Sequence, residues 1–324
     1  MAVFVNTNYS ALQGQRYLGN VQNQLTTTYQ RLSSGMRINS AKDDAAGLQI
    51  ADRLTSQING LNQGNRNASD GIALAQTMEA GMDEISGMLQ KMRTLTVQAA
   101  NGTNTMEDRK ALGKEMASLA TEVNRIAMQT TFAGKTILNG KTKEGSIYGD
   151  DNTLAGDPGT AGKTGSVTLQ VGSNKGDTIT FEAKSLMFSA LGGLSDKFIK
   201  DDASVFFDTD KNTGAITIDM TKLNFADQGN DAYVGKIIEA MDTMIQTVDG
   251  MRADLGALQN RLESSIRNQS NVAANEADAR SRIRDADFAE ESANLSQQSI
   301  IQQAAASMLM QANTRPQLGL SLLG

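Results

Sequence analysis

The stretch that decides the fold lies in the C-terminal third of the protein, where residues 234–262 read VGKIIEAMDTMIQTVDGMRADLGALQNRL. One set of apolar residues recurs every seven positions: Val234, Met241, Val248, Leu255 and Leu262. A second set fills the complementary heptad position: Ile237, Met244, Met251 and Leu258. Two apolar positions in each successive heptad are typical of a helix that packs lengthwise against partner helices. The segment therefore predicts a long helix in a coiled-coil bundle.

The N-terminal part of the sequence carries the partner helices that such a bundle needs. Apolar residues between Ala75 and Ala99 follow steps of three and four, and the two prolines lie elsewhere, so a helix over roughly 44–100 is expected. The core positions singled out on this helix are Met82, Ile85, Leu89 and Met92. After a turn at Asn101-Gly102, Thr105 and Asp108 have the spacing of a capping box. A second helix is therefore expected to fold back on the first.

The two ends of the sequence have a different character and complementary charge. Residues 1–40 contain three arginines and no acid, whereas residues 285–324 contain four acids and one arginine. Both ends are rich in polar residues, so we expect them to be unfolded in the monomer and to order by packing on each other and on neighbouring subunits. The residues expected in this subunit packing are Leu18, Val21, Leu25, Leu32, Phe288, Leu295 and Leu309.

The central region, residues 141–230, loses the helical pattern and holds 12 of the 30 glycines. Strand-like runs flank turn residues at 172–177 and again at 208–214, which predicts two β-hairpins. Residues 156–164 resemble a phosphate-binding loop, but five residues rather than four separate the key glycines. The acidic run that begins at Asp208 approaches calcium-loop spacing with its glycine one place late. We interpret both as ordinary turns in a surface-exposed insertion.

Composition excludes most catalytic chemistry. The sequence has no cysteine, histidine or tryptophan, so disulfides, thiolate or imidazole catalysis and the usual zinc sites are absent. No pair of carboxylates stands out from solvated helix faces, and we expect no catalytic, cofactor or metal site. The net charge of −6 gives no support for a nucleic-acid partner. No stretch approaches the ~20 apolar residues of a membrane span.

Four segments together resemble the bacterial flagellins. Residues 32–50 read LSSGMRINSAKDDAAGLQI, and residues 67–77 read NASDGIALAQT. At the other end, residues 277–291 read ADARSRIRDADFAEE, and residues 311–317 read QANTRPQ. These motifs are similar to the terminal signatures of the family and occur in the same order, over about 1–140 and 231–324.

The resemblance implies a mainly α fold, a long antiparallel helical rod formed by the N- and C-terminal segments with a small hairpin-containing central insertion. It implies that 1–40 with 285–324 form an inner, filament-core domain, that 41–140 with 231–284 form the rod, and that 141–230 form the insertion. The implied function is a non-enzymatic subunit that polymerises into the flagellar filament, the propeller for swimming. The implied partners are further copies, an export chaperone, and the cap and hook–filament junction proteins. Export would use the flagellar type III apparatus and place the protein outside the cell.

The resemblance also implies recognition by a Toll-like receptor of animal hosts, which senses flagellins through the rod. By resemblance the contacting residues are Lys91, Leu95 and Glu115. The family pattern favours arginine at the position of Lys91, and lysine lacks the planar, two-pronged guanidinium group of arginine. Partial burial of Leu95 within its own bundle is the alternative interpretation. Two other functions stay open at this stage, a flagellin-like junction protein and a secreted enzyme or adhesin with flagellin-like ends.

Overall fold

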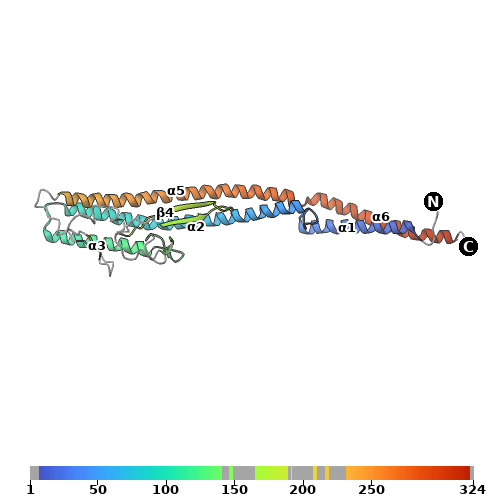
Figure 1. Cartoon of the computed structure of the whole chain (residues 1–324), viewed down its shortest axis with the longest axis horizontal. Helices are drawn as coiled ribbons and strands as arrows, with labels where there is room; N and C mark the ends of the chain where they lie inside the picture. The colour runs from blue at the N-terminus through green and yellow to red at the C-terminus, as the bar shows by residue number, and fades with distance from the viewer. Residues whose placement is uncertain are drawn as a thin grey trace. The chain divides into compact units, whose positions relative to one another are not determined.

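The computed structural model describes residues 7–140, 146–148, 165–188, 191, 207–209, 216–218 and 231–321. Long helices make up most of it (Figure 1). They are α1 (Tyr9–Ser34), α2 (Ala45–Ala99), α3 (Met106–Gln129), α5 (Asp231–Arg284) and α6 (Phe288–Ser321). The mainly α prediction is confirmed.

Local signals explain where these helices begin and end. α2 occupies nearly the range expected from its apolar pattern. α3 begins with the capping box, in which Asp108 N donates to Thr105 Oγ1 and Thr105 N donates to Asp108 Oδ2. α1 ends at Gly35, whose φ of 69° lies in the left-handed region that glycine adopts without strain. The two helix ends therefore coincide with local capping signals.

Short antiparallel strands pair locally. β1 (Thr131–Phe132) pairs with β2 (Lys135–Thr136), β3 (Gly165–Gln170) with β4 (Thr178–Ala183), and β5 (Phe207–Thr209) with β6 (Ile216–Ile218). The hairpin predicted around 172–177 is confirmed, and in the second hairpin the strands pair while residues 210–215 lie outside the described residues. The segment 156–164, which resembles a phosphate-binding loop, also lies outside them.

The chain divides into two compact units. We call residues 1–59 with 271–324 the terminal unit and residues 60–270 the rod unit. Their boundaries lie within α2, after residue 59, and within α5, after residue 270, whereas the sequence led us to expect boundaries at 40/41 and 284/285. The two divisions measure different things, because a compact unit reflects contacts within one molecule whereas the expected filament-core domain reflects contacts between copies.

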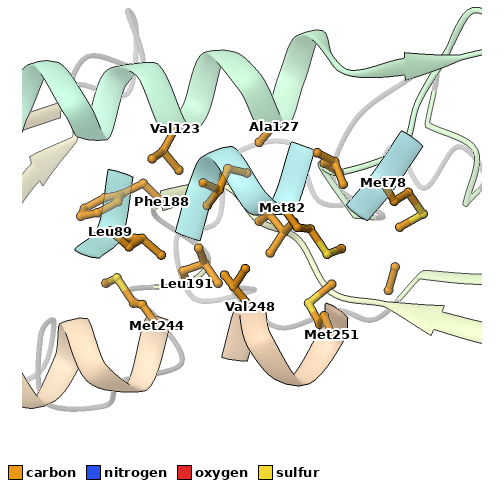
Figure 2. Packing of buried hydrophobic residues seen from close by; sticks show 14 of the residues in the cluster. Met78, Met82, Leu89, Val123, Ala127, Phe188, Leu191, Met244, Val248 and Met251 are labelled. Atoms are coloured by element: carbon orange, nitrogen blue, oxygen red, sulfur yellow. The ribbon is translucent and has the colours of Figure 1, made fainter. Parts of the chain in front are cut away.

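The core of the rod unit is formed by the apolar faces of α2, α3 and α5 (Figure 2). On α2 the apolar series from Ala75 to Ala99 is buried throughout, including Met82, Ile85, Leu89 and Met92. On α5 the buried heptad positions are Ile237, Met241, Met244, Val248, Met251, Leu255, Leu258 and Leu262. Val234 lies in α5, but its side chain is outside the described residues. Both heptad positions of α5 therefore face the core along the described part of the pattern.

Part of the central region belongs to this core. The buried residues there are Tyr148, Val171, Ala183, Leu186, Phe188 and Leu191. The expectation of a surface-exposed insertion is wrong for these residues, because three helices leave apolar grooves that the bundle cannot close by itself. Figure 2 shows Phe188 and Leu191 among the side chains of the helices. Burial raises the pKa of the Tyr148 phenol, whose hydroxyl donates to Ile137 O.

Candidate functional site

The terminal helices α1 and α6 pack on each other along their length. Thr28 Oγ1 donates to Gln298 Oε1 at 3.2 Å, and Asn8 Nδ2 donates to Ala312 O at 2.8 Å. Gly14 lies against Leu309, so closely that an added Cβ would be 3.2 Å from its Cδ1 atom. These contacts fix the register of the two helices.

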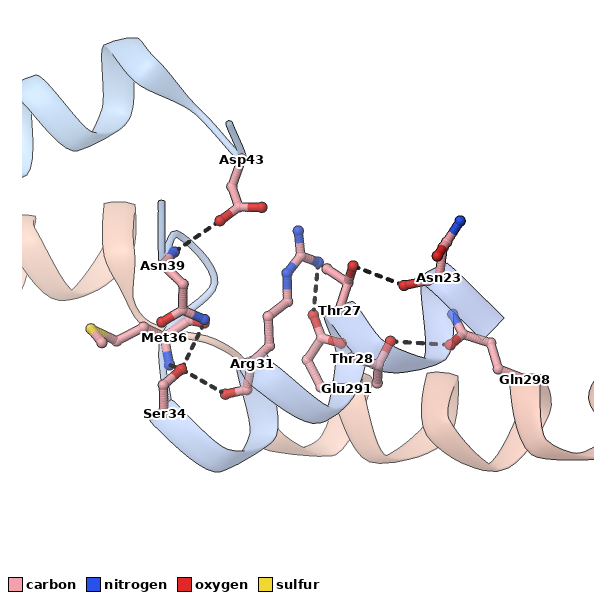
Figure 3. Close-up of polar contacts among 10 residues, drawn as sticks. All are labelled: Asn23, Thr27, Thr28, Arg31, Ser34, Met36, Asn39, Asp43, Glu291 and Gln298. Atoms are coloured by element: carbon pink, nitrogen blue, oxygen red, sulfur yellow. Dashed lines mark hydrogen bonds and ion pairs between the residues drawn. The ribbon is translucent and has the colours of Figure 1, made fainter. Parts of the chain in front are cut away.

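One ion pair joins the oppositely charged ends of the protein. Arg31 Nη1 lies 3.1 Å from Glu291 Oε1, and the Glu291 side chain is only 9 % exposed (Figure 3). Because the carboxylate is removed from water, loss of the arginine would leave a buried unpaired charge, at a cost of about 3–5 kcal/mol. The charge asymmetry seen in the sequence thus corresponds, at this pair, to a specific contact.

The segment between α1 and α2 is held by backbone and side-chain hydrogen bonds. Arg37 N donates to Arg284 O at 2.7 Å, and Ala286 N donates to Gly35 O at 3.0 Å. Asp43 Oδ2 accepts from the backbone and hydroxyl of Ser40 and from Asn39 N, as Figure 3 shows for Asn39. Hydrogen bonds from Ser40, first its backbone N–H and then its hydroxyl, lower the pKa of Asp43. The segment that connects α1 to α2 is therefore well defined.

Most of the apolar surface of the helix pair is left uncovered. In α1 the buried residues are only Val21 and Thr28. Eight large apolar side chains of the pair are between 52 % and 73 % exposed: Tyr9, Leu12, Tyr17, Tyr29, Phe288, Ile300, Met308 and Met310. Open grooves lie along the pair, one lined in part by Leu12 and Leu309 and another by Tyr17 and Met308. Exposed apolar side chains in this number are a feature of surfaces that contact other molecules.

The family of this protein follows from comparison with known proteins. The model of the bacterial flagellin N-terminal helical region matches residues 5–143, and that of the C-terminal helical region matches residues 238–323. The chain belongs to the bacterial flagellin family. The two matched regions contain α1, α2 and α3 at one end and α6 with most of α5 at the other.

Full-length relatives agree with this assignment. The chain is 38 % identical to flagellin D of Vibrio anguillarum over 387 aligned positions that cover both proteins completely. It is likewise 38 % identical to flagellin A of Vibrio cholerae. A solved Vibrio parahaemolyticus structure described as a flagellar hook-associated protein matches 75 % of the chain with a TM-score of 0.53 and 16 % identity, which concerns the fold alone. The chain is a flagellar filament subunit, a structural protein and not an enzyme.

The packing residues expected from the sequence occupy different environments in this flagellin. Val21 is buried, and Phe288 is 68 % exposed. The partly buried ones are Leu18, Leu25, Leu32, Leu295 and Leu309. The heptad spacing does not single out exposed side chains such as Tyr17 and Met308, which line an open groove along the pair. Their signal in the sequence is a large apolar residue in an otherwise polar part of the helix.

The residues expected at the host-receptor surface of this flagellin do not share one environment. Lys91 Nζ forms an ion pair with Glu115 Oε1 at 2.9 Å, which joins α2 to α3, and both side chains are exposed. Leu95 is only 7 % exposed and belongs to the rod core. The structure thus brings Lys91 and Glu115 together on the surface and places Leu95 beneath it.

Among the described residues, no group of acidic side chains is placed to hold a metal ion. None of the helices described is long and apolar enough to cross a membrane. The acidic run that resembles a calcium loop has Asp208 in β5, while Asp210 and Asn212 lie outside the described residues.

Proposed function

We propose that the α1–α6 pair is the surface through which this flagellin polymerises. The observation that carries the proposal is the number of exposed large apolar side chains on both helices. Full burial of one such side chain stabilises a contact by about 1.5–3 kcal/mol. A pair of helices can cover only one face of each helix, so the remaining faces need other helices, and further copies of the same protein supply them in a homopolymer.

The proposal includes folding coupled to assembly. A helix that buries little surface is stabilised mainly by its neighbours, because short isolated helices are marginal in water. α1 buries two residues, and in the described part of α6 the buried residues are Glu291 and Ala305. We therefore expect the terminal helices to fray in the free monomer and to order fully when neighbouring subunits cover them.

On this proposal, 1–40 with 285–324 form the filament core, 41–140 with 231–284 form the rod domain, and 141–230 extend from the rod. The filament lies outside the cell, and the subunit passes through the flagellar export apparatus with a chaperone. The cap and junction proteins contact the same terminal helices. Host-receptor recognition is proposed for the surface around Lys91 and Glu115, with Leu95 supporting it from below.

A charge placed on the uncovered face tests the assembly surface. Ile300→Asp adds a carboxylate to an exposed position of α6, so it costs the monomer little but would be desolvated in the polymer. We expect loss of seeded polymerisation, measured by light scattering and electron microscopy, with an unchanged melting temperature of the rod unit.

Met106→Asp is the matched control. Met106 is 61 % exposed in the first turn of α3, where a carboxylate is favourable beside the helix N-terminus. This variant should polymerise normally. If Ile300→Asp polymerises as well as Met106→Asp, the uncovered face of α6 is not a subunit contact.

A further inference from the structure

Three Asn-Gly dipeptides occur in the sequence, at 59–60, 101–102 and 139–140. An Asn-Gly dipeptide can undergo an intramolecular reaction in which the glycine amide nitrogen attacks the carbonyl carbon of the asparagine side chain. Glycine has no Cβ, so nothing blocks the approach. A new bond between that nitrogen and that carbon closes a five-membered succinimide, the original bond from the carbon to the asparagine amide nitrogen breaks, and ammonia leaves. Water then opens the ring at either carbonyl, which gives aspartate or isoaspartate. The reaction needs no enzyme or oxidant, but it needs a backbone that can bend toward the asparagine amide.

Two of the three dipeptides are held in geometries that oppose this reaction. Asn59 and Gly60 lie inside α2, where the helical backbone fixes the amide nitrogen in the hydrogen-bond ladder. Asn139 is 1 % exposed, and Gly140 packs against Ser185. Reaction at either site would require local opening of the fold around it.

The third dipeptide is arranged in the opposite way. Asn101 and Gly102 form the exposed turn between α2 and α3, and open space surrounds Gly102. Within the part of the protein that the structure describes, the Gly102 N–H donates no hydrogen bond, so the nucleophile is free. Thr103 N lies 3.4 Å from Asn101 Oδ1 and is placed to donate to it. That oxygen is where negative charge develops during the attack, so the donor stabilises the reacting state.

We propose that Asn101 is a site of spontaneous deamidation and isoaspartate formation in the folded protein. The product carries one additional negative charge between the C-terminus of α2 and the N-terminus of α3. The Asn101 carbonyl accepts from Asn104 N at 3.2 Å and from Arg109 Nη2 at 3.4 Å. In isoaspartate the backbone runs through the former side-chain carbonyl and is one methylene longer, and the original Asn101 carbonyl becomes a free carboxylate, so both contacts change. Each copy of the subunit thereby acquires an age-dependent change at this turn.

The test uses the full-length protein incubated in mildly alkaline buffer and sampled over time. Peptide mass spectrometry follows replacement of the amide nitrogen by oxygen at all three asparagines, and ammonia release is measured in parallel. We expect Asn101 to react more than about tenfold faster than Asn59 and Asn139, since the latter two must wait for local opening. In denaturant the three rates should converge, because the dipeptide is the same.

Variants separate this chemistry from general instability. Asn101→Gln lengthens the side chain, and Gly102→Ala hinders the nitrogen without a clash, because the position is open. Both should abolish the fast reaction and the signal from an isoaspartate-specific carboxyl methyltransferase, with unchanged circular dichroism. Equal rates at the three sites in the folded protein, or a fast signal that persists in Asn101→Gln, would overturn the proposal.

Discussion

Gly64 shows how a single missing side chain sets the packing of the rod unit. A Cβ at this position would overlap the carbonyl of Val171, just after β3, and would lie 3.1 Å from Gln269 Oε1. Gln269 Nε2 also donates to the Val171 carbonyl, and Asn67 Nδ2 donates to Gln170 O at 2.9 Å. The β3–β4 hairpin is therefore held against α2 and α5 by close backbone approach and side-chain hydrogen bonds, as its position in Figure 1 suggests.

Gly64→Ala should destabilise the rod unit by about 1–3 kcal/mol, because the added methyl group forces the hairpin away from α2. Gly87→Ala is the matched control, since Gly87 lies in the same helix with open space around it. There alanine should stabilise by about 0.5–1 kcal/mol through its higher helix propensity. Urea unfolding followed by circular dichroism measures both. Equal stabilisation by the two substitutions would show that the hairpin does not rest on α2.

At the scale of elements, the sequence predicts the helices but not which residues pack over their apolar faces. The period of the apolar residues and the capping box at Thr105 are local signals, so α2 and the start of α3 could be read from the sequence. Burial of Leu186 and Phe188 depends on a groove that exists only after the three helices have packed. Burial of Leu95 likewise depends on which face of α2 its partners cover.

The same reasoning applies to the candidate site. The α1–α6 pairing could be anticipated from complementary charge and modest apolar periodicity, and the Arg31–Glu291 contact is one realisation of it. The set of exposed apolar side chains could not be anticipated, because it depends on how the two helices are rotated relative to each other. The α1–α6 contact also buries a polar side chain, because Thr28 is 4 % exposed and donates to Gln298.

The N-terminus of α3 gives a prediction that depends on pH. Hydrogen bonds from the side chain and backbone of Thr105 lower the pKa of Asp108 below its ordinary value of 3.8. Since the folded-state pKa is below the unfolded one, ionised Asp108 stabilises α3 above the unfolded pKa, and this contribution is lost as pH falls through the folded value. The wild type should therefore melt above Asp108→Asn at neutral pH, and the difference should vanish in acid. A difference that stays constant down to the acid limit would mean that the charge contributes nothing.

At the scale of the whole molecule, the two units are stabilised in different ways. The rod unit has a continuous core of its own, whereas the terminal unit buries few residues and depends on the pairing of α1 with α6. Removal of residues 285–324 should therefore abolish polymerisation while the rod unit keeps its melting temperature. Helicity by circular dichroism should fall by more than the deleted helix contributes, because α1 loses the contacts that order it.

Leu255→Asp provides the contrast in the full-length protein. Leu255 is 4 % exposed in the rod core, so an unpaired carboxylate there costs several kcal/mol and should unfold the rod unit itself. Calorimetry of the truncated protein and of Leu255→Asp separates the two kinds of loss, one of assembly and one of folding. A truncated protein that melts as far below the full-length monomer as Leu255→Asp does would show that the terminal helices support the rod before assembly, and folding coupled to polymerisation would be refuted.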